Sequence, residues 1–302
     1  MIFKYLTTIS LLILSSISEA APDTQLLKKL DLERSLFSEQ YENFSINSQD
    51  IIYVIQQSTT AITLGVAVMI AESGTSVIGK NGLRPLATQL NDLGWVTIIM
   101  PAPDTAFLPS IQEPLDTDIP EPDEQGSEVT QPDPTGDKIA EIAPTKNQSR
   151  SIESQLNAVS FLKHEKELIA LLKESATRAA NYPGFFLVIA QGTSAAWMAK
   201  IYSEKMLETP DALVTISPFW PDRKLNETLP ILIANTPMPV LDLYSENDNK
   251  WSLQTVKRRE VFAVKALKLQ YRQRKMLGLT NADQNSLYLS KEIYGWTSYM
   301  GW

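Results

Sequence analysis

The sequence predicts an α/β fold: a mostly parallel, twisted sheet with helices on both faces and one antiparallel strand at an edge. In the 302 residues, 43% of them hydrophobic, short apolar runs rich in β-branched residues alternate with stretches of helical periodicity. Strands covered on both faces have near-continuous apolar sequences. Strand and helix in steady succession indicate parallel strands joined by helices.

Six apolar runs are the expected strands. They span residues 51–55, 63–70, 95–100, 185–190, 212–216 and 240–244. Only a short turn separates the first run from the second, so the first is expected to pair antiparallel at one edge of the sheet.

Four stretches between and after these runs are expected to be helical, at about residues 82–93, 151–179, 194–208 and 252–278. The last one is strongly basic, with Lys257, Arg258, Arg259, Lys265, Lys268, Arg272, Arg274 and Lys275. Its apolar residues predict a buried stripe with the cations facing water: Val256, Phe262, Ala263, Ala266, Leu267 and Leu269.

The first twenty residues have the pattern of a secretory signal peptide. Lys4 precedes an apolar run, and the small residues Ser18 and Ala20 stand at the minus-three and minus-one positions before Ala21. We expect cleavage of residues 1–20, leaving the single domain 21–302 in the periplasm or secreted from a bacterium. An uncleaved N-terminal anchor is the alternative. No later segment is apolar enough to cross a membrane.

Residues 102–150 differ from the rest of the chain in composition. They contain eleven acidic and three basic residues, a balance equal to the net charge of −8 of the whole chain, and eight of its 18 prolines. Such a segment buries too little apolar surface to offset its ordering entropy of about 1–2 kcal/mol per residue. We expect a disordered acidic insertion, either a solvated loop or a tether for a partner.

The composition excludes several classes of chemistry. With no cysteine and one histidine, the chain cannot form disulfides, thiolate zinc sites, iron–sulfur ligation or His-rich metal sites. An excess of 35 acidic over 27 basic residues is not the footprint of a nucleic-acid-binding protein. We therefore expect no cofactor, no metal and no nucleic-acid partner.

The end of the run 185–190 resembles the nucleophile elbow of α/β-hydrolases, a sharp turn from strand to helix over small residues. In one register Ser194 is the nucleophile. In the other the nucleophile position is Gly192, between Gln191 and Thr193, and Ser194 caps the helix. The second register is favoured because the apolar strand ends two residues before Gly192.

The remaining members of a catalytic triad are only partly present. Asp248 follows the run 240–244, where a triad acid is expected. No histidine follows Asp248. The single histidine, His164, lies well inside the expected helix 151–179 among charged residues, and the sequence predicts that it is a surface residue.

The loop after the run 63–70 is a candidate rim of the same site. It contains Glu72 and Gly74, where a hydrolase forms part of its oxyanion hole. Gly74 permits close approach, but Glu72 would repel a developing oxyanion. This loop favours polar or cation-coordinating contacts over acyl transfer. The alternative is that it is only a turn that starts the next helix.

Several segments together resemble an uncharacterised family of exported bacterial α/β-hydrolase-like proteins. They are residues 65–70, 83–86, 94–101 and 239–242, the basic stretch at Arg258, Arg259 and Ala263, and residues 271–273 and 293–296. The resemblance implies an α/β-hydrolase-like fold and a location in the bacterial envelope. It implies no activity.

Two hypotheses follow. The favoured one is a periplasmic protein without a working Ser-His-Asp triad that binds a small molecule or an envelope protein. The alternative is a divergent esterase-type serine hydrolase with Ser194 as nucleophile and Asp248 as acid. A third possibility, a scaffold that binds a partner through residues 102–150 or the basic helix, is compatible with all of the sequence features described above.

Overall fold

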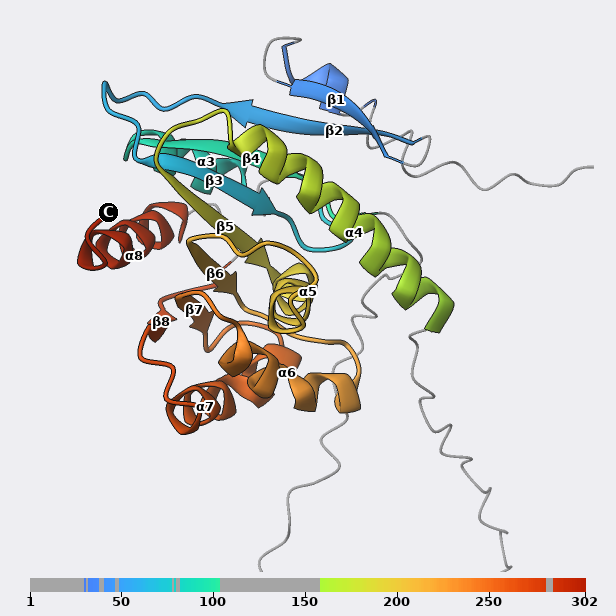
Figure 1. The fold of residues 1–302 in the computed structure, drawn as a ribbon, viewed down its shortest axis with the longest axis vertical. Coiled ribbons are helices and arrows are strands. Elements are labelled where there is room, and N and C mark those ends of the chain that lie inside the picture. Colours follow the sequence, from blue (N-terminus) through green and yellow to red (C-terminus); the bar gives the residue numbers. More distant parts are fainter. Residues whose placement is uncertain are drawn as a thin grey trace, which may run out of the picture.

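The computed structural model describes residues 30, 32–37, 41–46, 49–77, 79, 82–103, 158–280 and 285–302. Eight strands form one sheet in the order β1-β2-β4-β3-β5-β6-β7-β8 (Figure 1). Their bounds are β1 Tyr41–Ile46, β2 Gln49–Gln56, β3 Gly65–Ile70, β4 Trp95–Met100, β5 Phe185–Gln191, β6 Ala212–Ile216, β7 Val240–Ser245 and β8 Tyr271–Met276.

Helices cover both faces of this sheet. Their bounds are α3 Arg84–Asn91, α4 Ala158–Ala179, α5 Gly192–Ser203, α6 Arg223–Asn235, α7 Lys250–Lys265 and α8 Ser286–Tyr299. Side chains of α4, α5 and α6 share one hydrophobic cluster, and those of α3 and α8 share a second on the opposite face. Figure 1 shows the first group in front of the sheet and α3 behind it.

The sheet confirms the predicted fold class. Strands β4, β3, β5, β6, β7 and β8 pair in parallel, and β2 pairs antiparallel with β4 and with β1. The expected antiparallel edge is therefore present, although the outermost strand is β1, which the sequence did not predict. Every residue of β3, β4 and β6 is buried, as in strands covered on both faces.

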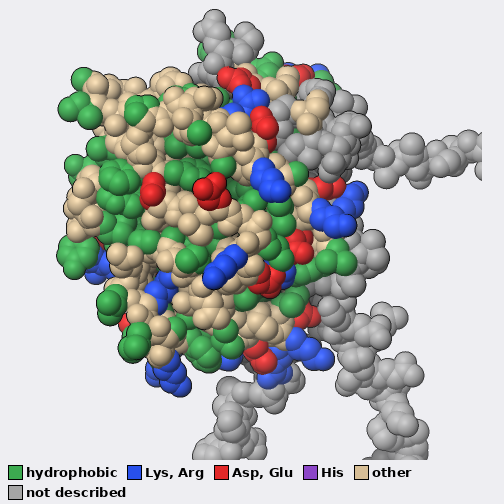
Figure 2. Space-filling view, viewed as in Figure 1, with side chains coloured by type: hydrophobic (Ala, Val, Ile, Leu, Met, Phe, Trp, Pro, Cys, Tyr) green, Lys and Arg blue, Asp and Glu red, His purple; other side chains and the backbone are tan. Residues whose placement is uncertain are grey.

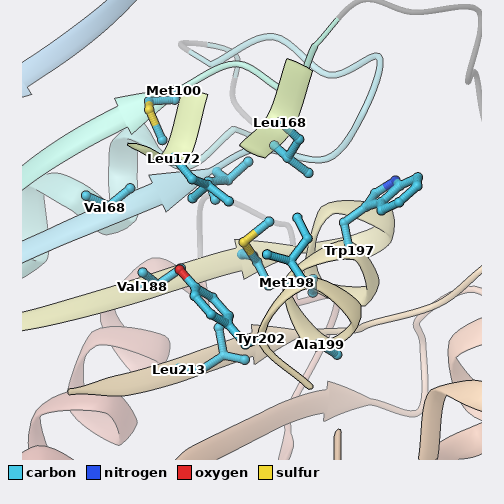
Figure 3. Close-up of a cluster of buried hydrophobic side chains, with 14 of the residues drawn as sticks. Val68, Met100, Leu168, Leu172, Val188, Trp197, Met198, Ala199, Tyr202 and Leu213 are labelled. Atoms are coloured by element: carbon cyan, nitrogen blue, oxygen red, sulfur yellow. The ribbon is translucent and has the colours of Figure 1, made fainter. Parts of the chain in front are cut away.

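The core on the front face is built around α5. Figure 3 shows Met198 and Tyr202 of this helix facing side chains of the strands and of α4. Trp197 is fully buried, and its ring meets that of Phe161 with centroids 4.2 Å apart. Because α5 is buried over almost its whole length, the turn at its start has a fixed position relative to the strands.

The predicted basic helix at 252–278 is wrong in its second half. Helix α7 ends at Lys265, and residues Tyr271–Met276 form the edge strand β8, which pairs in parallel with β7. The cations in β8 had favoured a solvated helix face, but charged side chains are also what protects an exposed edge strand from pairing with other chains. Leu267 and Leu269, expected in the buried stripe, are 80% and 94% exposed.

Arg259 is a second correction to the same segment, because it is fully buried instead of facing water. Its Nε donates to Asp242 of β7 at 2.7 Å, and its Nη1 donates to Thr255 at 2.6 Å. Tyr271 and Gln273 of β8 also donate to Asp242, at 2.7 and 2.8 Å. This network connects α7 and the edge strand β8 to β7, the strand that precedes the loop with Asp248.

Other elements were predicted less completely. The sequence did not predict α6 or α8, and the helices at 82–93 and 194–208 were placed within a few residues of α3 and α5. The predicted signal peptide, residues 1–20, and nearly all of the acidic insertion 102–150 lie outside the described residues. Within the described part of the chain, none of the helices is long and apolar enough to cross a membrane.

Candidate functional site

The candidate site lies where the parallel strands end. Glu72 follows β3, Gly192 follows β5, and Asp248 follows β7, so the topology brings these residues to one edge of the sheet. In open α/β sheets, ligands bind in the crevice at the carboxyl ends of the strands. A small pocket of about 100 Å³ occupies this edge, lined by Glu72, Gln191, Gly192, Ser217, Phe219, Asp248, Asn249, Leu279 and Thr280.

Gly192 occupies the turn from β5 into α5. Its φ is +58°, in the left-handed region that favours glycine, and Gln191 before it is extended. The chain therefore turns sharply at Gly192, in the second of the two registers that the sequence allowed. An added Cβ on Gly192 would lie 2.5 Å from Cδ and 2.7 Å from Oε2 of Glu72. The carboxyl group of Glu72 fills the space that a nucleophilic side chain at the elbow would need.

The loop after β3 holds Glu72 in this position. The backbone N–H and the hydroxyl of Thr75 both donate to the carbonyl oxygen of Glu72, at 3.0 and 2.7 Å. Gly74 continues the turn with a φ of +83° and is exposed. Burial, and to a smaller extent the nearby Asp248 carboxylate, raise the pKa of the Glu72 carboxyl to about 7. Glu72 therefore titrates near neutral pH.

Asp248 is held by four donors from three segments. Ser217 Oγ and the Ser245 N–H donate to its Oδ2 at 2.5 and 2.6 Å, and the Thr280 hydroxyl and N–H donate to its Oδ1 at 2.8 and 3.3 Å. These four bonds occupy the acceptor positions of the carboxylate. Asp248 thus joins the loops after β6, β7 and β8 and places a fixed negative charge beside the pocket.

Ser194 lies away from this pocket. It is the third residue of α5, is fully buried, and donates from Oγ to the carbonyl oxygen of Ala71 at 2.7 Å. The expectation that its hydroxyl caps the first turn of the helix is wrong, since no side chain caps α5. The hydroxyl instead ties α5 to the end of β3, so the structure does not bring Ser194 together with Asp248.

His164 is not the surface residue that the sequence predicted. It is fully buried in α4, with its ring 5.2 Å from and stacked on Trp197. Burial lowers the pKa of His164 to about 4, so the imidazole is neutral at physiological pH. The charged neighbours in the sequence misled the prediction because the 3.6-residue period turns them to other faces of the helix. His164 belongs to the core, and none of the described residues lining the pocket is a histidine.

The two residues that flank Gly192 differ in their surroundings. Gln191 is 3% exposed and lines the pocket, whereas Thr193 is fully buried and is not among the lining residues. The sequence missed five residues at this edge. Asn249 directly follows Asp248 in the loop after β7. Ser217 and Phe219 follow β6, and Leu279 and Thr280 follow β8. The strand-end rule applied to residues 212–216 identifies Ser217 and Phe219, but it does not identify Leu279 and Thr280, because the sequence of β8 predicts a helix.

The described residues also limit what the site can hold. Outside the masked segments, no group of three or more His, Asp or Glu side chains is placed to bind a metal ion. The lining side chains offer carboxyl, amide and hydroxyl oxygens together with the apolar surfaces of Phe219 and Leu279. Such a pocket suits a small ligand that donates hydrogen bonds.

Solved structures of similar fold are α/β hydrolases. Est1E from Butyrivibrio proteoclasticus matches with a TM-score of 0.53 at 7% identity, over 86% of this chain and 98% of that chain. An α/β serine hydrolase homologue from Coxiella burnetii gives 0.51 at 14% identity, over 86% and 97%. An α/β serine hydrolase without a lid from Xanthomonas campestris gives 0.51 at 12%, over 88% and 97%. At these identities, the likeness shows the α/β-hydrolase fold alone.

Comparison with curated proteins finds no match. One family model, described as a protein of unknown function, matches residues 13–299. This range contains every strand and helix described above, together with Glu72, Gly192 and Asp248. The chain therefore belongs to the DUF3530 family, whose function is unknown.

Proposed function

We propose that this chain is an exported bacterial protein of the α/β-hydrolase fold that has no working Ser-His-Asp triad and acts by binding. The observation that carries the proposal is the pair Glu72 and Gly192. Glycine stands at the turn where a hydrolase of this fold has its nucleophile, and the Glu72 carboxyl takes up the side-chain space at that position. A small molecule would then enter the pocket at the sheet edge.

The rest of the pocket supports the same proposal. A serine nucleophile needs a general base within about 2.6–3.2 Å or through one water. The imidazole of His164 is in the core, and the four donors to Asp248 hold loops together and do not orient an imidazole. Stabilisation of a negative charge at the elbow would also be opposed by the two carboxyl groups.

The alternative, a divergent hydrolase that uses Ser194, is less well supported by the geometry. The Ser194 hydroxyl is fully buried and bonded to Ala71 O, so it has neither access to a substrate nor a basic partner. The two α/β serine hydrolases compared above are 14% and 12% identical to this chain and carry no residue roles over to it.

Ester hydrolysis tests this proposal. The mature chain should give the same background turnover of short and long p-nitrophenyl esters as its Ser194→Ala variant. Turnover that is well above background and is lost in Ser194→Ala would overturn the proposal in favour of the hydrolase. Circular dichroism of both proteins checks that the comparison is between folded chains.

Export rests on the sequence of residues 1–20 and is part of the proposal. Expression of the full chain in a Gram-negative host should yield protein in the periplasmic fraction whose N-terminus is Ala21. Protein that stays with the membrane fraction and begins at Met1 would instead support the uncleaved anchor. An envelope protein is the alternative partner to a small molecule.

On the face drawn in Figure 2, basic, acidic and apolar side chains are interspersed.

A further inference from the structure

The pocket at the sheet edge is lined by a buried side chain whose acceptor oxygen the protein leaves unused. Gln191 is 3% exposed and lines the pocket, and its Oε1 has no hydrogen-bond partner among the described residues. A buried polar atom without a partner costs about 1–3 kcal/mol. A ligand that donates a hydrogen bond to Gln191 would remove this cost, so the atom indicates the kind of group that belongs in the pocket.

The charge around the pocket is negative. The only charged side chains among the described lining residues are Glu72 and Asp248. The acceptor positions of Asp248 are taken by Ser217, Ser245 and Thr280, so this residue contributes charge without offering a lone pair. None of the hydrogen bonds between described residues reaches the Glu72 carboxyl, which faces the same space. Glu72 and Gln191 together provide three unused oxygen acceptors beside a second negative charge.

A small ammonium group fits these acceptors better than a bare metal ion. An ammonium group has three N–H donors, and hydrogen bonds from a cation to a carboxylate are about twice as strong as neutral ones. Phe219 and Leu279 form an apolar part of the wall, which a hydrocarbon chain would contact and a hydrated metal ion would not. A volume of about 100 Å³ holds about four or five heavy atoms, since a 150 Å³ cavity holds benzene.

We infer that this pocket binds the ammonium group of a small primary amine, or the amine end of a longer molecule, through Glu72 and Gln191. The inference rests on the proposed binding function and names its ligand class. Asp248 acts on the ligand through its charge, without a direct hydrogen bond. Gly192 has no side chain, so the space beside it is open to the Glu72 carboxyl and the ligand.

Binding and the ionisation of Glu72 are coupled. The Glu72 carboxyl has a pKa near 7, raised by burial and by Asp248, which is the one other charged group among the described residues facing it in the pocket. An ammonium ligand favours the ionised form of Glu72 and lowers its pKa. Affinity should therefore rise by about tenfold between pH 6 and pH 8, as the ionised fraction of a group with this pKa does.

The test is a calorimetric titration of the mature chain with propylammonium chloride at pH 6 and pH 8. Propionate, of similar size and opposite charge, is the matched ligand control. Glu72→Gln should weaken propylammonium binding at pH 8 by tenfold or more and abolish the difference between the two pH values. Gln191→Met, which keeps the size of the side chain and removes its acceptor, should weaken binding by about fivefold.

Glu227→Gln, an exposed change on α6, is the matched control variant and should leave binding unchanged. Failure of propylammonium to bind, equal binding to Glu72→Gln, or tighter binding of propionate would overturn the inference. If Glu72→Gln does not fold, the pH dependence of the unaltered chain decides the question. Saturable propionate binding that depends on Gln191 would reject the ammonium ligand and keep the binding function. Ser194-dependent ester turnover would reject the proposed function itself.

Discussion

The carboxyl group of Glu72 occupies the space in which a side chain on Gly192 would stand. A Cβ on Gly192 would lie 2.5 Å from Glu72 Cδ and 2.8 Å from its Cγ. Real Cβ atoms do not approach other heavy atoms so closely, so one of the two groups must move if the other is enlarged. The residue after β3 and the residue after β5 are thus structurally coupled across the pocket.

This coupling predicts the effect of restoring a nucleophile. Gly192→Ser should lower the free energy of unfolding by about 2 kcal/mol or more, because it adds an overpacked contact and a non-glycine residue at positive φ. Adding Glu72→Ala should recover the steric part, seen as a favourable coupling in a double-mutant cycle by urea unfolding. Strictly additive losses would contradict the contact. Ester turnover should not appear in either variant, since the added hydroxyl has no imidazole partner.

The buried pair of Asp242 and Arg259 predicts the largest loss of stability. Arg259→Met should lower the free energy of unfolding by about 3–5 kcal/mol, because it leaves the fully buried Asp242 carboxylate without its cation. Arg258→Met, the exposed neighbouring residue on α7, is the control and should change stability by less than about 1 kcal/mol. Chemical unfolding of both variants measures the difference. Similar losses of unfolding free energy in the two variants would show that the buried ion pair contributes no more to stability than the exposed Arg258.

His164 predicts a loss of stability in acid. Its pKa is lowered from 6.5 to about 4 in the folded chain, so the unfolded chain binds the proton more tightly. Stability from this group is complete above pH 6.5 and falls as the pH drops toward 4, by up to about 1.4 kcal/mol per pH unit. His164→Phe, which keeps the stacking on Trp197, should lose less stability over this range. The melting temperatures of both proteins from pH 4.5 to 7.5 provide the comparison, and parallel curves would refute it.

Glu72 predicts the opposite trend. Its pKa is raised from 4.5 to about 7 in the folded chain, so its contribution to stability is complete below pH 4.5 and is lost as the pH rises to 7. Glu72→Gln cannot ionise and should be more stable than the unaltered chain at pH 8, by about 3 kcal/mol. The gain should shrink to nothing near pH 4.5. A stability difference that does not vary with pH would mean that Glu72 has an ordinary pKa.

The buried strands were the easiest part of the fold to predict. Runs such as 95–100 and 212–216 are apolar throughout because both faces of the sheet are covered, and the structure has strands with these bounds. The edges were harder. β8 carries cations that also suit a helix, and β1 is a short polar strand that only its pairing with β2 identifies. Local sequence does not contain the tertiary pairing that decides such segments.

The place of the candidate pocket, at the carboxyl ends of the parallel strands, could be predicted from the sequence. Glu72, Gly192 and Asp248 were expected at one edge because they follow parallel strands, and the pocket brings these three together. The directions in which the Ser194 and His164 side chains point could not be predicted from the sequence. Ser194 and His164 differ from their expected surroundings because helix packing turned both toward the core. The clash between Glu72 and position 192 also depends on two loops 120 residues apart in the chain.

A fluorophosphonate probe tests most directly whether this fold still holds a serine nucleophile. The account predicts that the folded chain forms no covalent adduct detectable by intact mass, because Gly192 has no side chain and the Ser194 hydroxyl is buried against Ala71 O. An active serine esterase under the same conditions provides the positive control. An adduct on Ser194 of the folded chain, lost after heat unfolding, would contradict the account.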